Sequence, residues 1–181
     1  MEKNLTEEIL RVCQILNKNG VQYLIVGGTA VAFHGYFRWS QNSTGVPTEK
    51  YDLDIWYNPT YDNYFKLLNA LSELGQDVKE FFEEQSPNPL KSYFKFDLNK
   101  FTLDFLPKLK GATKFKQAYE KKEITTIKGI DMQFIGFVEL LQDKAANSRP
   151  KDLAAPRSVS SPAKQILYSP PPRSVSSPTS A

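Results

Sequence analysis

Two short apolar runs constrain the fold of this chain more than any other feature. The first run spans Tyr23–Ala30 and is broken by the pair Gly27-Gly28. A strand that enters a glycine turn and then a helix leaves backbone N–H groups pointing outward, which favours a bound phosphate at that corner. The second run, Tyr51–Trp56, is a predicted strand that carries two carboxylates. The pair of runs predicts a phosphate corner beside an acidic strand.

The acidic strand places its carboxylates on one face. Asp52 and Asp54 are two residues apart, and alternate side chains of a strand point the same way. Asp104 repeats the pattern, because it interrupts the apolar strand Thr102–Leu106. An unpaired charge among apolar neighbours is unfavourable. The three acids therefore indicate either a shared divalent cation for phosphoryl or nucleotidyl transfer, or three separate salt bridges to lysine or arginine.

Hydrophobic periodicity and turn residues predict alternating helices and strands along the chain. Helices are expected at 4–18, 29–34, 61–74, 77–84, 115–120 and 137–147, and strands at 21–26, 52–57, 92–97, 100–106, 124–128 and 130–135. In the helix at 77–84 both phenylalanines are expected to point inward, and 39–50 is expected to be a loop. The pattern predicts one α/β (α+β) domain over residues 1–153, with a mixed, strongly twisted sheet and flanking helices.

Several single residues are open to a structural and a functional interpretation. Cys13 lies on the apolar face of the first helix and is expected to be a small buried residue. His34 is expected to fix the end of a helix rather than act as a base. Arg38 is either a phosphate contact or a surface arginine. Helical spacing favours core packing over base stacking for three aromatic residues, Tyr61, Tyr64 and Phe65.

Charge and targeting features exclude some classes of function. Residues 1–150 hold 19 basic and 19 acidic side chains, so this part has no net charge. Tight non-specific nucleic-acid binding, which needs clustered phosphate contacts, is not indicated, although a local basic groove is compatible with the sequence. The single cysteine excludes an internal disulfide. No signal peptide and no apolar run of membrane-spanning length is found, so a cytoplasmic protein without membrane contact is expected.

The composition changes abruptly near residue 150. From there on the chain has seven prolines and eight serines, and the heptapeptide Pro-Arg-Ser-Val-Ser-Ser-Pro occurs at 156–162 and again at 172–178. Such a segment has too little apolar surface to offset the entropy of ordering it. Residues 154–181 are therefore expected to be a disordered tail, either without a defined role or serving as a binding segment.

The motifs taken together resemble a known family. Gly27-Gly28-Thr29, Asp52-Leu53-Asp54 and Asp104 resemble the nucleotidyltransferase fold of the DNA polymerase beta superfamily. Residues 27–36, 52–56 and 143–153 are also similar to segments of the small bacterial AbiEii-type nucleotidyltransferases, which are toxins of toxin–antitoxin and abortive-infection systems. The resemblance covers residues 1 to about 153.

The resemblance implies roles for individual residues. The backbone of Gly27, Gly28 and Thr29, with the Thr29 hydroxyl, would hold the triphosphate of an NTP. Asp52, Asp54 and Asp104 would bind Mg²⁺ or Mn²⁺, and Asp104 would also help to deprotonate the attacking hydroxyl. Lys144 would lie near the phosphates. Two further residues, Arg149 and Asp152, would complete the late motif.

The implied reaction moves a nucleoside monophosphate from an NTP to an acceptor hydroxyl. The acceptor would be the 3′ end of an RNA such as tRNA, or a protein, and a cognate antitoxin would be a partner. The alternatives are a small-molecule nucleotidyltransferase of the aminoglycoside type and a non-catalytic binding module of the same fold. The chain departs from the family at Ala155, where a closing helix would continue. Loss of that helix is expected to expose part of the core and to weaken the site around Lys144.

Overall fold

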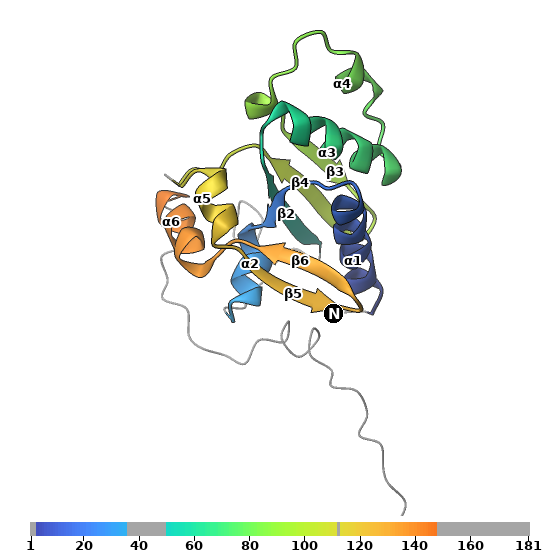
Figure 1. The fold of residues 1–181 in the computed structure, drawn as a ribbon. Coiled ribbons are helices and arrows are strands. Elements are labelled where there is room, and N and C mark those ends of the chain that lie inside the picture. Colours follow the sequence, from blue (N-terminus) through green and yellow to red (C-terminus); the bar gives the residue numbers. More distant parts are fainter. Residues whose placement is uncertain (1–2, 36–49, 112, 148–181) are drawn as a thin grey trace, which may run out of the picture.

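The computed structural model describes residues 3–35, 50–111 and 113–147 as a sheet flanked by helices (Figure 1). In chain order the elements are α1 (Lys3–Lys18), β1 (Tyr23–Ile25), α2 (Gly27–Phe33), β2 (Tyr51–Tyr57), α3 (Tyr61–Glu73), α4 (Lys79–Glu83), the short 3₁₀ helix Pro89–Lys91, β3 (Phe94–Asp97), β4 (Phe101–Leu106), α5 (Phe115–Glu120), β5 (Glu123–Ile127), β6 (Ile130–Phe134) and α6 (Phe137–Asn147). The predicted order of helices and strands is confirmed.

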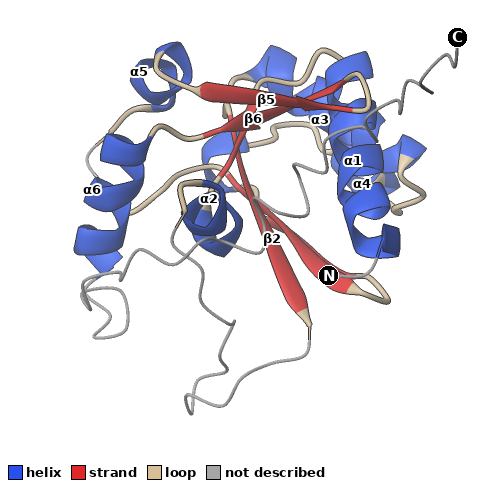
Figure 2. Cartoon of the chain, turned by 90° about the horizontal axis from the view of Figure 1, so that it is seen from below, coloured by secondary structure: helices blue, strands red, loops and turns tan. Residues whose placement is uncertain are grey.

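The strands form one six-stranded mixed sheet in the order β3-β4-β2-β1-β6-β5. Two neighbouring pairs are parallel, β2 with β4 and β1 with β6, and the other three pairs are antiparallel. Figure 2 shows β5 and β6 running across the direction of β2, so the sheet is strongly twisted. This bears out the predicted α/β class with a mixed, twisted sheet.

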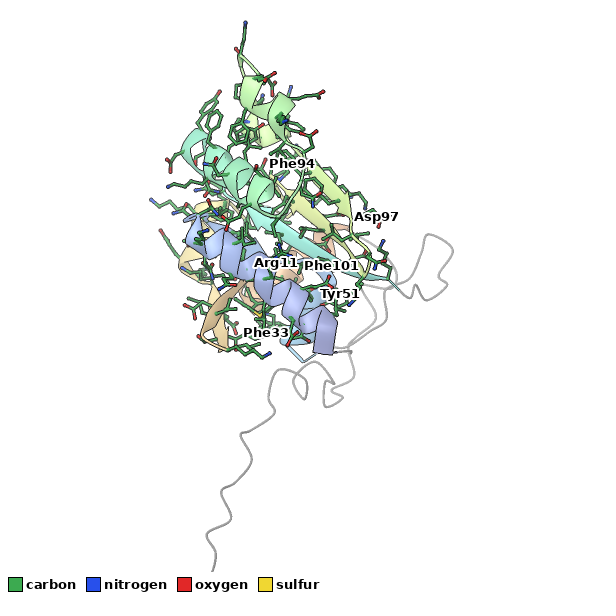
Figure 3. The ribbon with its side chains drawn as sticks, turned by 90° about the vertical axis from the view of Figure 1, so that its right-hand side faces the viewer. Arg11, Phe33, Tyr51, Phe94, Asp97 and Phe101 are labelled. Atoms are coloured by element: carbon green, nitrogen blue, oxygen red, sulfur yellow. The ribbon has the colours of Figure 1, made fainter. Side chains whose placement is uncertain are left out.

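The main core lies between the sheet and helices α1 and α3. Along β2, Leu53, Ile55 and Tyr57 are fully buried on one face, because alternate residues of a strand share a face. Figure 3 shows Tyr51 and Phe101 side by side at one end of the β2–β4 pair, with Phe94 toward the other end. These alternating positions place the polar residues of β2 on the opposite face.

Helix α1 packs its apolar stripe against this core, and Cys13 is fully buried in it. Burial raises the pKa of the Cys13 thiol to about 12, because the thiolate would lose its hydration there. The expectation of a small buried apolar residue is confirmed. None of the helices in the described part of the chain has the length and apolar character needed to cross a membrane.

Helix α3 shows where helical periodicity misleads. Tyr64 is fully buried, as predicted, but Tyr61 is 61% exposed and Phe65 is 37% exposed. The buried face instead carries Asn63 and Leu67. The side-chain amide of Asn63 explains why this face of α3 is turned toward the core. Its Oδ1 accepts from the Gln22 N–H at 2.7 Å, and its Nδ2 donates to two backbone carbonyls. The prediction of a core position was therefore wrong for Tyr61 and Phe65.

Several other boundaries and orientations differ from the expectation. Helix α2 begins at Gly27 itself rather than after the glycine pair, and β1 is only three residues long. In α4 Phe81 packs against the core, but Phe82 is 42% exposed, because a helix of five residues buries only one side. The predicted loop at 39–50 lies largely outside the described residues, as do Arg38, Arg149, Asp152 and the expected tail at 154–181.

Helix α6 buries one leucine and exposes another. Leu140 is 2% exposed, whereas Val138 is 59% and Leu141 is 49% exposed. Val138 and Leu141 are three residues apart and so share a face of the helix. Helix α6 therefore presents an apolar outer face, while the expected loss of a closing helix concerns residues outside the described ones.

Candidate active site

The three predicted acids lie together on one face of the sheet. In the parallel register of β2 and β4, Asp54 lies directly opposite Asp104, and Asp52 lies opposite Thr102. Asp52 and Asp54 share a face because they are two residues apart, and directly opposed residues share it too. Their neighbours Leu53 and Leu103 are fully buried on the other face. The structure thus brings Asp52, Asp54 and Asp104 together.

The carboxylate of Asp104 has one occupied and one free oxygen. Its Oδ2 accepts a hydrogen bond from the Tyr93 hydroxyl at 2.9 Å and another from Lys95 Nζ at 3.2 Å. Its Oδ1 is buried and has no hydrogen-bond partner in the described part of the chain. A buried polar atom without a partner is unfavourable, so a ligand at Oδ1 would relieve a cost that the fold otherwise bears.

Asp52 and Asp54 differ in their surroundings. The Thr102 hydroxyl donates to Asp52 Oδ1, across the same strand pair. Burial, together with the nearby carboxylates of Asp104 and Asp52, raises the pKa of Asp54 to about 6, whereas Lys144 and Lys95 act in the opposite direction. Asp54 therefore experiences the electrostatic field of both other acids and of Lys144.

The glycine turn is packed directly against Asp54. Gly27 has a φ of +63°, and a Cβ built on it would lie 2.0 Å from Asp54 Oδ2. The Val26 N–H donates to the Asp54 carbonyl at 2.9 Å, and the Thr29 hydroxyl donates to the Asp52 carbonyl at 3.2 Å. One backbone and one side-chain hydrogen bond therefore connect the turn to the acidic strand. The hydroxyl proton of Thr29 is taken up by the second of these bonds.

Gly28 has open space around it, because a Cβ there would meet nothing within 4 Å. The residue before helix α2, Val26, provides no side-chain cap for the first turn. A ligand could therefore approach the start of α2 closely at Gly28. The predicted phosphate corner needs such open space beside uncapped backbone N–H groups.

Helix α6 brings Lys144 toward the acids. The carboxylate of the preceding residue, Asp143, is buried and accepts from the backbone N–H groups of Lys110 and Gly111 at 3.1 and 3.3 Å. These bonds fasten α6 to the segment that follows β4, the strand of Asp104. The effect of Lys144 on the pKa of Asp54 fits this position. The family resemblance implied a place for Lys144 near the phosphates.

His34 has a structural position, as expected. Its Nε2 donates to the Ile135 carbonyl at 2.9 Å. The ring lies in contact with Phe33 and Phe137, at centroid separations of 5.2 and 5.4 Å. The histidine thereby fastens the end of α2 to the β6–α6 junction.

The donor set suits a hard divalent cation, although the side chains are not arranged around one. Carboxylate oxygens are the ligands that Mg²⁺ and Mn²⁺ prefer. Among the described residues no three acidic, histidine or cysteine side chains already converge closely enough to hold a metal ion. Instead, Asp52 accepts a hydrogen bond from Thr102, and Asp104 accepts hydrogen bonds from Tyr93 and Lys95. Oδ1 of Asp104 has no partner among the described residues, so this oxygen can take a cation without losing a hydrogen bond.

Tyr93, Lys95 and Thr102 are site residues that the sequence did not reveal as such. Lys95 lies opposite Asp104 in the antiparallel register of β3 and β4, so Lys95, Asp104 and Asp54 form one row across three strands. The predicted hairpin at 92–106 contained the necessary signal, because its tight turn determines which residues are opposed. Tyr93 lies two residues before Lys95 and so shares its face.

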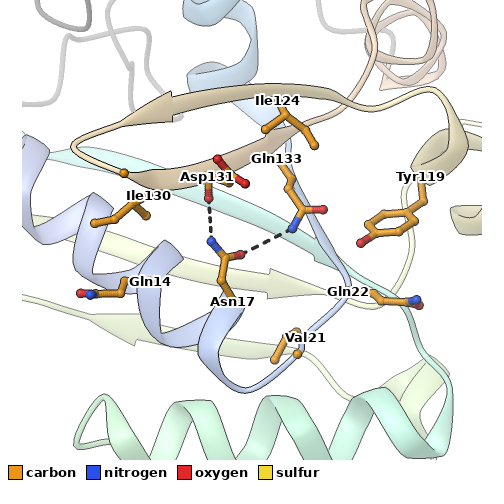
Figure 4. Close-up of a pocket in the computed structure, with 11 residues that line it drawn as sticks. Gln14, Asn17, Val21, Gln22, Tyr119, Ile124, Ile130, Asp131 and Gln133 are labelled. Atoms are coloured by element: carbon orange, nitrogen blue, oxygen red, sulfur yellow. Dashed lines mark hydrogen bonds between the residues drawn. The ribbon is translucent and has the colours of Figure 1, made fainter.

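A separate pocket of about 630 Å³ lies beside α1 and the β5–β6 hairpin (Figure 4). Its polar lining includes Asn17, Asp131 and Gln133. Asn17 Nδ2 donates to the Asp131 carbonyl at 2.8 Å, and Gln133 Nε2 donates to Asn17 Oδ1 at 3.5 Å. None of the predicted site residues lines this pocket.

Comparison with known proteins places the fold. No protein-family model matches the chain, and no curated protein matches it either. A crystal structure of a candidate nucleotidyltransferase from Thermotoga maritima is similar, with a TM-score of 0.52 and 15% sequence identity over 83% of this chain and 89% of that one. At this identity the likeness concerns the fold, and it gives no support to the AbiEii type in particular. The chain thus has a nucleotidyltransferase-like fold, a mixed six-stranded sheet with flanking helices.

Proposed function

We propose that this protein is a metal-dependent nucleotidyltransferase. The observation that carries the proposal is the position of Asp54, which faces Asp104 across the β2–β4 pair and lies against Gly27 of the turn. Acids on one strand face, beside a turn open to phosphate, form the arrangement that nucleotidyl transfer needs. The fold shared with a candidate nucleotidyltransferase supports the same reaction.

Each part of the site has a task in this reaction. Asp52, Asp54 and Asp104 would hold Mg²⁺ or Mn²⁺, which supplies charge stabilisation at the transferred phosphoryl group. The turn at Gly27 and Gly28 would bind the triphosphate of the NTP through backbone N–H groups, and Lys144 would offset its negative charge. Holding both reactants in line provides much of the rate enhancement, because little covalent chemistry is asked of the protein.

The acceptor hydroxyl would attack the α-phosphate and release pyrophosphate. The carboxylate of Asp104 would help to take the proton of that hydroxyl. We propose as acceptor the 3′ end of an RNA such as tRNA, or a protein side chain, and an antitoxin as a partner of a toxin-like chain. A cytoplasmic location would supply both NTP and Mg²⁺.

The experiment incubates the chain with NTPs labelled at the α-phosphate, Mg²⁺ and, in separate reactions, total RNA, a protein lysate or aminoglycosides. Transfer of label to one fraction identifies the acceptor class, and Asp54→Asn and Asp52→Asn should abolish it. Asp62→Asn is the matched control, because Asp62 is exposed on α3 and pairs with Lys66. Absence of transfer to RNA, protein and aminoglycosides would contradict the proposal. NTP binding without transfer would instead favour a non-catalytic binding module.

A further inference from the structure

The carboxylate of Asp104 is held from one side only. Among the described residues, the two donors that reach it are Tyr93 and Lys95, on the β3 side of β4, and both bond to Oδ2. The Asp104 side chain is only 13% exposed, so neither oxygen has water as an easy substitute. Within the part of the chain that the structure describes, Oδ2 thus has two donors and Oδ1 has none.

Ordinary salt bridging does not explain this arrangement well. Lys95 is 56% exposed, and an exposed lysine contributes little as a simple ion pair. The Tyr93 hydroxyl carries no charge, yet it makes the shorter of the two contacts. A neutral donor and a flexible lysine on the same oxygen restrict the rotation of the carboxylate. They leave Oδ1 as the oxygen available to a ligand.

We infer that Tyr93 and Lys95 are positioning residues, which orient Asp104 so that Oδ1 serves as the metal-binding oxygen. The inference rests on the proposed function in that it takes the three carboxylates as metal ligands. Hydrogen bonds from outside the ligand shell commonly hold ligating carboxylates, and their loss weakens metal binding about 10- to 100-fold. The pair therefore acts through Asp104 without contacting the substrate.

The test measures Mn²⁺ binding to the full chain by electron paramagnetic resonance of free Mn²⁺, without any NTP. Tyr93→Phe removes only the hydroxyl, and we expect it to weaken Mn²⁺ binding about 10-fold. Lys95→Met is more decisive, because two explanations predict opposite signs. Loss of a nearby positive charge alone would tighten cation binding, whereas loss of positioning weakens it. Lys95→Arg, which keeps the charge and donors, should restore binding close to that of the unaltered chain.

Matched controls are Tyr61→Phe and Lys66→Met, since both residues lie exposed on α3. Thermal unfolding of each variant verifies that the fold is retained. Mn²⁺ binding by Tyr93→Phe within twofold of the unaltered chain, or tighter binding by Lys95→Met, would overturn the inference and leave the proposed function standing. If the unaltered chain itself binds no Mn²⁺, or Asp54→Asn binds it equally well, the proposed function fails instead.

Discussion

The backbone of Gly27 lies against the carboxylate of Asp54, so closely that a Cβ at Gly27 would fall 2.0 Å from Oδ2. The same residue has a φ of +63°, in the left-handed region that side-chain-bearing residues rarely adopt. Conformation and contact therefore both require glycine here. Gly28, the next residue, has neither requirement, since its φ is not positive and a Cβ there meets nothing within 4 Å.

This contrast predicts different outcomes for two adjacent substitutions. Gly27→Ala should lower the free energy of unfolding by at least about 1–2 kcal/mol from the backbone alone, and should push the Asp54 side chain out of place. Gly28→Ala should leave stability unchanged or slightly raised, because alanine is the better helix former. Denaturant unfolding of both variants makes the comparison. Equal stability of the two would show that the turn is not packed as described.

The raised pKa of Asp54 predicts a pH-dependent gain in stability for Asp54→Asn. An aspartate whose pKa is raised in the folded state binds its proton more tightly when folded. Its contribution is favourable below the ordinary value of 3.8 and is lost as the pH rises toward about 6. Asp54→Asn should therefore be more stable than the unaltered chain at pH 7.5, by up to about 2–3 kcal/mol, with little of this gain left near pH 4.

Thermal unfolding across pH 4–8 tests this expectation, and Asp62→Asn serves as the control because that carboxylate is exposed. Added Mg²⁺ should raise the unfolding midpoint of the unaltered chain more at pH 7.5 than at pH 5, since a cation favours the ionised carboxylates. A variant less stable than the unaltered chain at pH 7.5 would argue against a raised pKa of Asp54, and so against the described effects of its burial and of its acidic neighbours.

Helix α6 offers a pair of adjacent leucines with opposite burial. Leu140→Ala removes a side chain that is 2% exposed and should cost about 2–5 kcal/mol, because it leaves a cavity. Leu141→Ala alters a side chain that is 49% exposed and should cost under about 1 kcal/mol. Denaturant unfolding at constant pH distinguishes them. Similar costs would mean that the outer face of α6 is covered in solution.

Much of this fold could be predicted because its strands alternate cleanly. β4 reads buried and half-buried in strict succession, so its span and its acid-bearing face follow from the sequence. Pairing between β2 and β4 does not follow, because 43 residues separate their ends and no local pattern decides which strands meet. The shared pattern of acids within apolar strands suggested that Asp104 joins Asp52 and Asp54, and the family resemblance implied the same grouping. The errors at Tyr61 and Phe65 arose because an aromatic-rich helix offers two overlapping apolar faces, and the buried Asn63 selects between them.

The hydrogen bond from the Val26 N–H to the Asp54 carbonyl offers a direct view of the site over time. This amide can exchange with solvent only when the turn separates from the acidic strand. Its hydrogen-exchange rate therefore measures how often the glycine turn separates from the acidic strand. The measurement needs no substrate, metal or label. Slow exchange at Val26 would show that the contact between the turn and the acidic strand is as stable as the centre of the sheet.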